Sequence, residues 1–347
     1  MLFNVEEDSG NRIVGYFVPD SYSAVPKILV SSHDVEIAAI DANIVRPGLV
    51  AAGRHETGLC GFELTTAILP SLADTVFLEL QEATSPFAFY RRRPQDLIVA
   101  RKVFRLETSQ HRLRGFDKVL STRFCSIFTG ADRFGRETMV QTLNLISVNS
   151  LYLSARLLYK EHEHSISGEM SSICVLQDPF TELAETLLGF SKGSPDNGSV
   201  LSLRDELSSP AMVDFAQSLD MRDADTLRRT LRAIPAEVEG LLENPLARIL
   251  AARTSEETSN LSYIASALVS LSSFDIIGVE EEPNSFIEPI AELLQLDSLG
   301  IQFSPAPAEA IDLARTLREM DEMHYLVELD LEIYRQVTDA LAISSSG

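Results

Sequence analysis

Ser171 to Phe190 reads SSICVLQDPFTELAETLLGF and predicts a buried strand that runs directly into a helix. The unbroken apolar run from Ile173 to Leu176 is typical of a strand that is buried on both faces of a parallel sheet. Asp178 is placed to cap a helix that opens with Pro179, where the missing N–H of proline is not needed. A strand followed at once by a capped helix forms either the edge of a ligand site in an open α/β sheet or a purely structural corner.

Two other stretches repeat this arrangement. The apolar run Phe124–Phe128 is followed by a polar loop with two glycines, residues 129–138, and then by a predicted helix that extends to Ile146. Phe274–Val279 predicts a third strand, and Asn284 is placed to cap the helix after it. The first of these loops has the form of an anion cradle, because backbone N–H groups and a helix N-terminus converge there.

Composition and charge limit the possible partners. The chain has 347 residues and a net charge of -22, from 29 Lys and Arg against 51 Asp and Glu. Nucleic acid and anionic membranes are therefore not expected as partners. No apolar run approaches the roughly 18 residues of a membrane span, so no transmembrane segment is expected. The three cysteines, Cys60, Cys125 and Cys174, lie far apart and predict reduced thiols of a cytoplasmic protein.

The first 93 residues predict a small all-β domain. Short apolar runs separated by turn residues are typical of an antiparallel sandwich or barrel. The expected strands are Ile13–Val18, Lys27–Val30, Val35–Ile40, Leu59–Leu64, Val76–Leu80 and Phe87–Tyr90.

We expect residues 94–119 to be a linker and residues 120–347 to form an α/β domain with many helices. The linker follows Arg91-Arg92-Arg93-Pro94, a basic hinge, and carries further basic residues at Arg101, Lys102, Arg105 and Arg112. Ion pairs within the protein are favoured for these residues over binding of an external phosphate or sulfate.

Apart from the three expected strands, the second half of the sequence is predicted to be mostly helical. Residues 148–159 and 200–272 are expected to be helical, and Pro305 and Pro307 introduce a closing helical region. Between them, Glu161-His162-Glu163-His164 is either a solvated connection or a metal-binding segment, since alternate histidines of a strand share one face. No third distant ligand is evident, so no metal site is predicted.

Together the three strand-to-helix stretches resemble the P-loop sulfotransferase family, in particular bacterial carbohydrate sulfotransferases. The family's first loop, similar to P-R-S-G-T-T, binds the 5′-phosphate of the sulfate donor PAPS. The corresponding stretch here is DRFGRET, residues 132–138. Arg133 and Gly135 match, whereas Arg136 and Glu137 replace hydroxyl residues ahead of Thr138.

The family's second unit carries R-D-P, whose arginine binds the 3′-phosphate. Here Gln177 stands in place of that arginine, followed by Asp178 and Pro179, and Thr186 is the candidate for a helix serine. Phe274–Glu281 resembles the family's late strand. Leu329–Tyr334 resembles its terminal helix, so the resemblance covers about residues 120 to 340.

The resemblance implies a site for PAPS, or for its product PAP, as cofactor. The cofactor-binding residues that it implies are Arg133, Gly135, Arg136, Thr138, Gln177 and Asp178. Each departure from the family pattern removes charge-assisted hydrogen bonds that contribute about 1.5–3 kcal/mol. The family's catalytic base, a His or Glu, has no clear counterpart, and Glu161, His162 and Glu163 are the candidates.

Three functions follow. The first is a non-catalytic, degenerate sulfotransferase-like protein that acts as a binding or scaffold module in bacterial polysaccharide synthesis or modification. The second is an active PAPS-dependent carbohydrate sulfotransferase. The third is a helical interaction protein with a β-sandwich domain and no such ancestry. A protein or a glycan is the expected partner, and an oligomer is compatible with each function.

Overall fold

The computed structural model describes residues 1–85, 88–109, 114–120, 122–145, 148–192, 210–221, 223–300 and 306–344. Phe87, Arg112, Ile146, Pro305 and residues 200–209, all named above, lie outside the described residues. The chain forms two compact units, residues 1–104 with 119–154 and residues 105–118 with 155–347. This division does not follow the expected domain boundaries, which stay a prediction. Among the described residues, no helix combines the length and the apolar character needed to cross a membrane.

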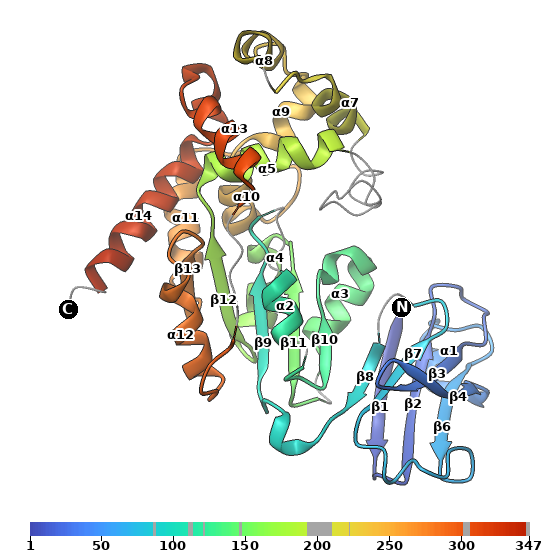
Figure 1. The fold of residues 1–347 in the computed structure, drawn as a ribbon. Helices are drawn as coiled ribbons and strands as arrows, with labels where there is room; N and C mark the ends of the chain where they lie inside the picture. Colours follow the sequence, from blue (N-terminus) through green and yellow to red (C-terminus); the bar gives the residue numbers. More distant parts are fainter. Residues whose placement is uncertain are drawn as a thin grey trace. The chain divides into compact units, whose positions relative to one another are not determined.

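A five-stranded parallel sheet has the strand order β10-β11-β9-β12-β13 (Figure 1). The three strands expected from the sequence are all present in it. The five strands are β9 Lys102–Leu106, β10 Ser126–Phe128, β11 Leu151–Ala155, β12 Ser171–Leu176 and β13 Ile276–Val279. Nearly every residue of β11 and β12 is buried, as expected of strands with helices on both faces.

The middle strand, β9, lies in the segment that the sequence predicts to be a linker. Within β9, Val103 and Phe104 are fully buried, and the side chain of Arg105 is only 3% exposed. Arg105 Nη2 donates to Asp117 Oδ1 at 2.9 Å and to Glu107 Oε1 at 3.3 Å. A buried arginine is tolerated because carboxylates satisfy it.

Two further predictions for this region are wrong. Residues 148–159, expected as a helix, contain β11 instead, because the β-favouring run LYLSA is short and buried throughout. Glu161–His164 is not a strand or an open connection but part of α4, Tyr159–Ser167. On a helix His162 and His164 point to different faces, which removes the geometric reason for a shared metal.

The N-terminal strands form two antiparallel sheets, in the orders β1-β2-β6-β5 and β4-β3-β7-β8. The all-β expectation for this part of the chain is therefore confirmed, with β1 and β5 in addition. The strands are β1 Leu2–Asp8, β2 Arg12–Val18, β3 Lys27–Ser32, β4 Val35–Asp41, β5 Ile44–Val45, β6 Leu59–Thr65, β7 Leu78–Glu82 and β8 Ala88–Arg92. Its short helices are α1 Pro47–Ala51 and η1 Gln95–Leu97.

Aromatic rings fill the core of this part. The ring of Phe3 stacks on that of Phe17, with 6.0 Å between the ring centroids. The ring centroid of Phe89 lies 5.1 Å from that of Phe17 and 5.9 Å from that of Phe62. Gly15 is required on β2, since a Cβ there would lie 2.4 Å from the carbonyl oxygen of Asn4.

The basic hinge residues form ion pairs within the protein, as expected. Arg92 Nε donates to Asp8 Oδ2 at 2.8 Å, and Arg91 and Arg93 both bind Glu79. These pairs leave the hinge arginines engaged with carboxylates of their own unit.

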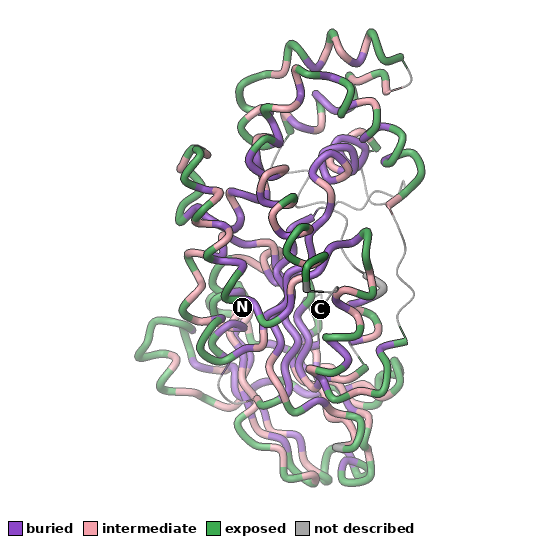
Figure 2. Tube along the Cα trace, turned by 90° about the vertical axis from the view of Figure 1, so that its left-hand side faces the viewer, coloured by how far each residue is buried: buried purple, intermediate pink, exposed green. Residues whose placement is uncertain are grey.

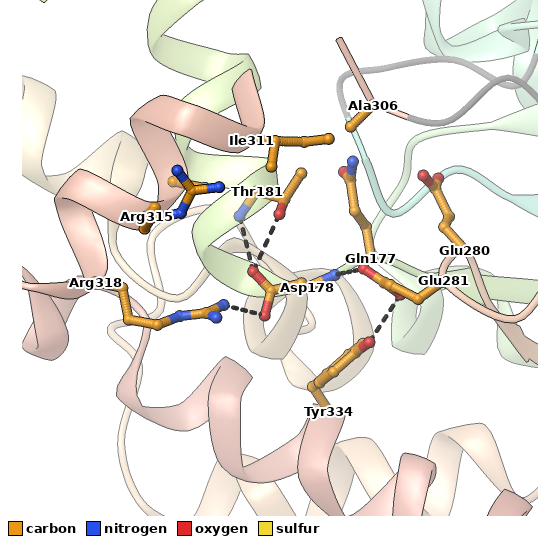
Figure 3. Close-up of a pocket in the computed structure, with 11 residues that line it drawn as sticks. Gln177, Asp178, Thr181, Glu280, Glu281, Ala306, Ile311, Arg315, Arg318 and Tyr334 are labelled. Carbon is orange, nitrogen blue, oxygen red and sulfur yellow. Dashed lines mark hydrogen bonds and ion pairs between the residues drawn. The ribbon is translucent and has the colours of Figure 1, made fainter. Parts of the chain in front are cut away.

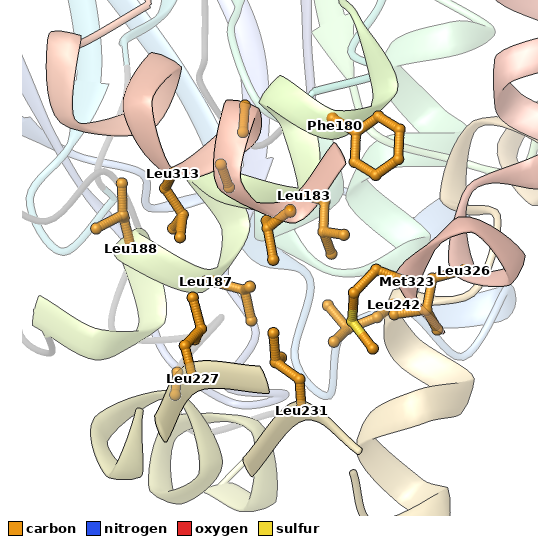
Figure 4. Packing of buried hydrophobic residues seen from close by; sticks show 14 of the residues in the cluster. Phe180, Leu183, Leu187, Leu188, Leu227, Leu231, Leu242, Leu313, Met323 and Leu326 are labelled. Carbon is orange, nitrogen blue, oxygen red and sulfur yellow. The ribbon is translucent and has the colours of Figure 1, made fainter. Parts of the chain in front are cut away.

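The remaining described elements are helical. They are α2 Arg114–Leu120, η2 Ala131–Phe134, α3 Arg136–Leu143, α5 Pro179–Lys192, α7 Pro210–Ser218, α8 Ala224–Leu231, α9 Ala236–Leu242, α10 Pro245–Ala251, α11 Ser262–Leu271, α12 Asn284–Leu293, α13 Ala308–Arg318, η4 Asp321–Leu326 and α14 Glu328–Ser344. The side chains of α5, α7, α8, α9, α13 and η4 form one apolar cluster (Figure 4). Leu187 of α5 and Leu227 of α8 are fully buried in it. Buried residues follow the strands of the sheet and the inner sides of these helices in Figure 2.

Gly278 of β13 provides a test of the packing between β13 and α12. A Cβ at Gly278 would lie 2.4 Å from Cβ of Phe286, so Gly278→Ala must displace α12 from the sheet. We expect a loss of about 1–3 kcal/mol in the free energy of unfolding. Urea unfolding followed by circular dichroism measures it.

Gly240→Ala is the matched control. Nothing lies within 4 Å of a Cβ at Gly240, on the exposed side of α9. This substitution should raise the free energy of unfolding by about 0.5–1 kcal/mol. Equal stability of the two variants would contradict the proposed close packing at Gly278.

Candidate functional site

The strand order identifies the edge of the sheet at which a ligand is expected. From β9 the chain continues to β10 on one side of the sheet, and from β12 it continues to β13 on the other. In open α/β sheets, ligands bind beyond the carboxyl ends of the strands where the direction reverses in this way. The carboxyl ends of β9 and β12 define this crevice.

The protein's own residues fill the crevice. Thr108, just after β9, donates its hydroxyl hydrogen to the carbonyl oxygen of Val175 on β12, at 2.7 Å. Arg156 Nη1 donates to the carbonyl oxygen of Thr108 at 2.8 Å. The cavity lined by Thr108, Ser109, Gln177 and Glu182 has a volume of only about 10 Å³. That volume holds about one water molecule.

Asp330 closes another side of the same small cavity. Its carboxylate accepts the N–H groups of Leu246 at 3.0 Å and Ala247 at 2.8 Å, at the start of α10. Burial raises the pKa of Asp330 to about 7, although these two hydrogen bonds act in the opposite direction. Asn244 completes the junction, since its Oδ1 accepts the N–H of Leu329 at 2.8 Å.

Gln177 occupies the turn after β12, and its side-chain amide donates a hydrogen bond within the protein. Its Nε2 donates to Glu185 Oε2 at 2.9 Å, on the next helix. Burial raises the pKa of Glu185 to about 6, and the bond from Gln177 opposes the rise. Gln177, which the resemblance aligns with a phosphate-binding arginine, is thus hydrogen-bonded to the carboxyl group of Glu185.

Asp178 caps α5 as predicted. Its Oδ1 accepts the N–H of Thr181 at 3.0 Å, and its own N–H donates to Glu281 Oε1 at 3.1 Å. Its Oδ2 accepts from Arg318 Nη2 at 2.6 Å. Carboxylates of the chain therefore occupy two of the N–H groups at this helix N-terminus, those of Asp178 and Thr181, which would otherwise attract an anion.

A larger pocket lies beside the crevice, beyond the carboxyl ends of β12 and β13 (Figure 3). Its volume is about 410 Å³, enough for a small organic molecule. The lining residues come from the turns after the two strands, from α5, α13 and α14, and from the segment just before α13. They are Gln177, Asp178, Thr181, Glu280, Glu281, Ala306, Ile311, Ala314, Arg315, Arg318 and Tyr334.

Glu280 is the buried acid of this pocket, with 8% of its surface exposed. Burial, as the largest cause, and the nearby carboxylates of Glu185, Glu182 and Glu281 together raise the pKa of Glu280 to about 9, while Arg105 opposes the rise. Glu280 therefore carries a proton at neutral pH. Its neighbour Glu281 accepts a hydrogen bond from the hydroxyl group of Tyr334 at 2.7 Å.

The residues expected at the first phosphate loop lie in the other unit, on η2 and α3. Gly135 has a φ of 89° and precedes Arg136, the first residue of α3. Thr138 is buried and its hydroxyl group interacts with Met1, accepting from the terminal ammonium at 2.9 Å and donating to the Met1 carbonyl at 3.2 Å. Arg133, Gly135, Arg136 and Thr138 are thus close in the chain, while Gln177 and Asp178 form a separate set in the second unit.

The candidate bases Glu161, His162 and Glu163 lie on α4. Glu163 pairs with Lys160 at 3.1 Å, and His162 Nε2 lies 3.8 Å from Glu161. Within the described ranges, no group of three or more His, Cys, Asp or Glu side chains is arranged to hold a metal ion.

Two residues of the site were not identified from the sequence. Thr108 lies two residues after β9, and because β9 contains a buried arginine, no alternating or unbroken apolar pattern indicated this strand. Glu280 is the first of three consecutive acids, Glu280-Glu281-Glu282, whose simplest interpretation from sequence is that their charges stabilise the start of the next helix. The signal that would have separated Glu280 from the other two is its position directly after the fully apolar end of β13.

No protein-family model matches this sequence, and no curated protein is significantly similar to it. The residues of the site and their geometry therefore carry the functional argument.

Because the pKa of Glu280 is raised in the folded protein, we expect the free energy of unfolding to depend on pH through this residue. A carboxyl group whose pKa is higher in the folded state stabilises the fold fully below its unfolded pKa of about 4.5, and this contribution is lost as the pH rises toward 9. Glu280→Gln keeps the neutral form at every pH. Its free energy of unfolding relative to wild type should increase by about 4–5 kcal/mol between pH 5 and 9.

Glu288→Gln, on the exposed side of α12, is the control and should show no such pH dependence. Urea unfolding midpoints at several pH values measure both variants. A stability difference between Glu280→Gln and wild type that stays constant with pH would refute the buried, protonated state of Glu280.

Proposed function

We propose that this chain is a degenerate sulfotransferase-like protein that no longer binds PAPS and acts as a binding module. The parallel sheet with its strand-to-helix units supports the kinship, together with the motif resemblance around Gln177-Asp178-Pro179. In this proposal the ligand site is the pocket beyond β12 and β13. The proposed role in bacterial polysaccharide synthesis or modification rests on the resemblance. The proposed location in the cytoplasm rests on the unpaired cysteines.

One observation carries the loss of donor binding: the crevice between the ends of β9 and β12 is closed by the chain itself. The hydrogen bond from Thr108 to Val175 and the cavity of about 10 Å³ leave no room for a nucleotide. An anion at the turn after β12 would also have to displace Glu281 from the N–H of Asp178.

Repulsion between the anionic donor and buried carboxylates also opposes donor binding. A nucleotide carrying phosphate and sulfate groups would approach Glu182 and Glu185, which are buried near this turn. Like charges at poorly hydrated positions raise the free energy of the complex, because few water molecules screen them. The active sulfotransferase of the sequence analysis would need these acids to be neutralised first.

Calorimetric titration of the full chain with PAP tests the proposal. We expect no binding, or a dissociation constant weaker than about 1 mM. Stoichiometric micromolar binding would overturn it, and so would transfer of labelled sulfate from PAPS to a bacterial glycan.

Arg136→Ala distinguishes the alternative if PAP does bind. Weaker binding in this variant would support the phosphate cradle on α3 and hence the active sulfotransferase. Unchanged binding would place the nucleotide elsewhere and reject both the cradle and the loss of donor binding.

A further inference from the structure

The 410 Å³ pocket contains a buried polar atom that has no hydrogen-bond partner among the described residues, and a mostly buried carboxyl group on the neighbouring strand end. The first is Gln177 Oε1, on a side chain that is 5% exposed. The second is the carboxyl group of Glu280, which is 8% exposed. A buried polar group without a partner costs about 1–3 kcal/mol, so the unpaired oxygen of Gln177 requires an explanation.

The two groups lie on neighbouring strand ends. Leu176 and Val279 are paired in the parallel register, and the N–H of Glu280 donates to the carbonyl oxygen of Leu176 at 2.9 Å. Gln177 and Glu280 are the next residues of each strand, and adjacent strands are about 4.8 Å apart. One nitrogen that makes two hydrogen bonds of about 2.8 Å can bridge acceptors at that spacing. Figure 3 shows the ends of both side chains pointing in the same direction.

We propose that this pocket binds a primary ammonium group, carried by a small aliphatic amine, between Gln177 Oε1 and the Glu280 carboxylate. The inference rests on the proposed binding function. An ammonium group has three donors and no acceptor, which matches the amide oxygen of Gln177 and the carboxyl group of Glu280 once it has ionised, since both then act only as acceptors.

The surrounding charges favour a cation over a neutral ligand. Glu182 and Glu185 of α5 and Glu281 beside Glu280 all act on Glu280, and Arg105 of β9 is the opposing cation. A sugar hydroxyl group would satisfy the hydrogen bonds but would leave this repulsion in place. A positive charge reduces it and allows Glu280 to ionise.

The rest of the pocket accommodates a short hydrocarbon chain. Ala306, Ile311 and Ala314 supply apolar contacts along one wall. Two cations also line the pocket. Arg318 is paired with Asp178 at 2.6 Å, and Arg315 with Asp312 at 3.2 Å. A second ammonium group on the ligand would approach these arginines, so a monoamine should bind better than a diamine.

The test uses n-butylamine as the probe, with butan-1-ol as the neutral control of similar shape. Isothermal titration of the full chain at pH 7.5 should give a dissociation constant of about 0.1–1 mM for the amine. 1,4-Diaminobutane should bind more weakly. 4-Aminobutanoate should bind at least as well if its carboxylate reaches Arg315, which identifies the ligand as an amino acid and not a simple amine.

Proton release provides the decisive measurement. Glu280 carries a proton at pH 7.5 because its pKa is about 9, and binding of an ammonium group should release close to one proton per site. Titrations in buffers of different ionisation enthalpy report this release. Binding of the amine without proton release would overturn the inference, as would equal binding of butan-1-ol.

Substitutions complete the test. Glu280→Gln should weaken amine binding by about 10- to 100-fold and abolish the proton release. Glu288→Gln, with the same change in charge on the exposed side of α12, should leave both unchanged. If neither butylamine nor PAP binds, the ammonium site is rejected while the loss of donor binding stands, and PAP binding would reject the proposed function itself.

Discussion

Three glutamates, Glu182, Glu185 and Glu280, are buried at the carboxyl edge of the parallel sheet, where few water molecules screen their charges. Their mutual repulsion constrains the rest of the site. Glu280 keeps its proton, and Glu185 accepts a hydrogen bond from the side-chain amide of Gln177. The N–H of Asp178, at the turn after β12, donates to a further carboxylate, that of Glu281. Such an arrangement is the opposite of a phosphate-binding turn, although the backbone there is that of a strand leading into a capped helix.

The sheet itself was partly predictable. Apolar runs such as Ile173–Leu176 report strands that are buried on both faces, and they gave three of the five strands. β9 was missed because its pattern depends on Arg105, whose burial becomes acceptable only through Glu107 and Asp117, residues outside the strand. Local pattern does not reveal such a partnership, since a lone arginine indicates a surface position. β11 was assigned to a helix for a related reason: a run of five residues is too short to show a period.

For the site, the sequence located the turn and not its chemistry. Asp178 was predicted as a helix cap and is one, because capping depends on residues next to it in the chain. The state of Gln177 and Glu280 depends on α5 and on the register between β12 and β13, which are set by tertiary packing. The four residues expected at the other phosphate loop, Arg133 to Thr138, lie in a different unit, and Thr138 serves to hold the N-terminus.

Each compact unit is assembled from two separate pieces of chain, and the short piece 105–118 belongs with residues that begin at 155. During synthesis this piece leaves the ribosome before the strand and helices that bury Arg105 and Phe116 exist. The first unit is likewise incomplete until residue 154 has emerged. The first unit can therefore fold once residue 154 has emerged, whereas the apolar side chains of residues 105–118 stay exposed to chaperones or to aggregation until the later residues of the second unit have been translated.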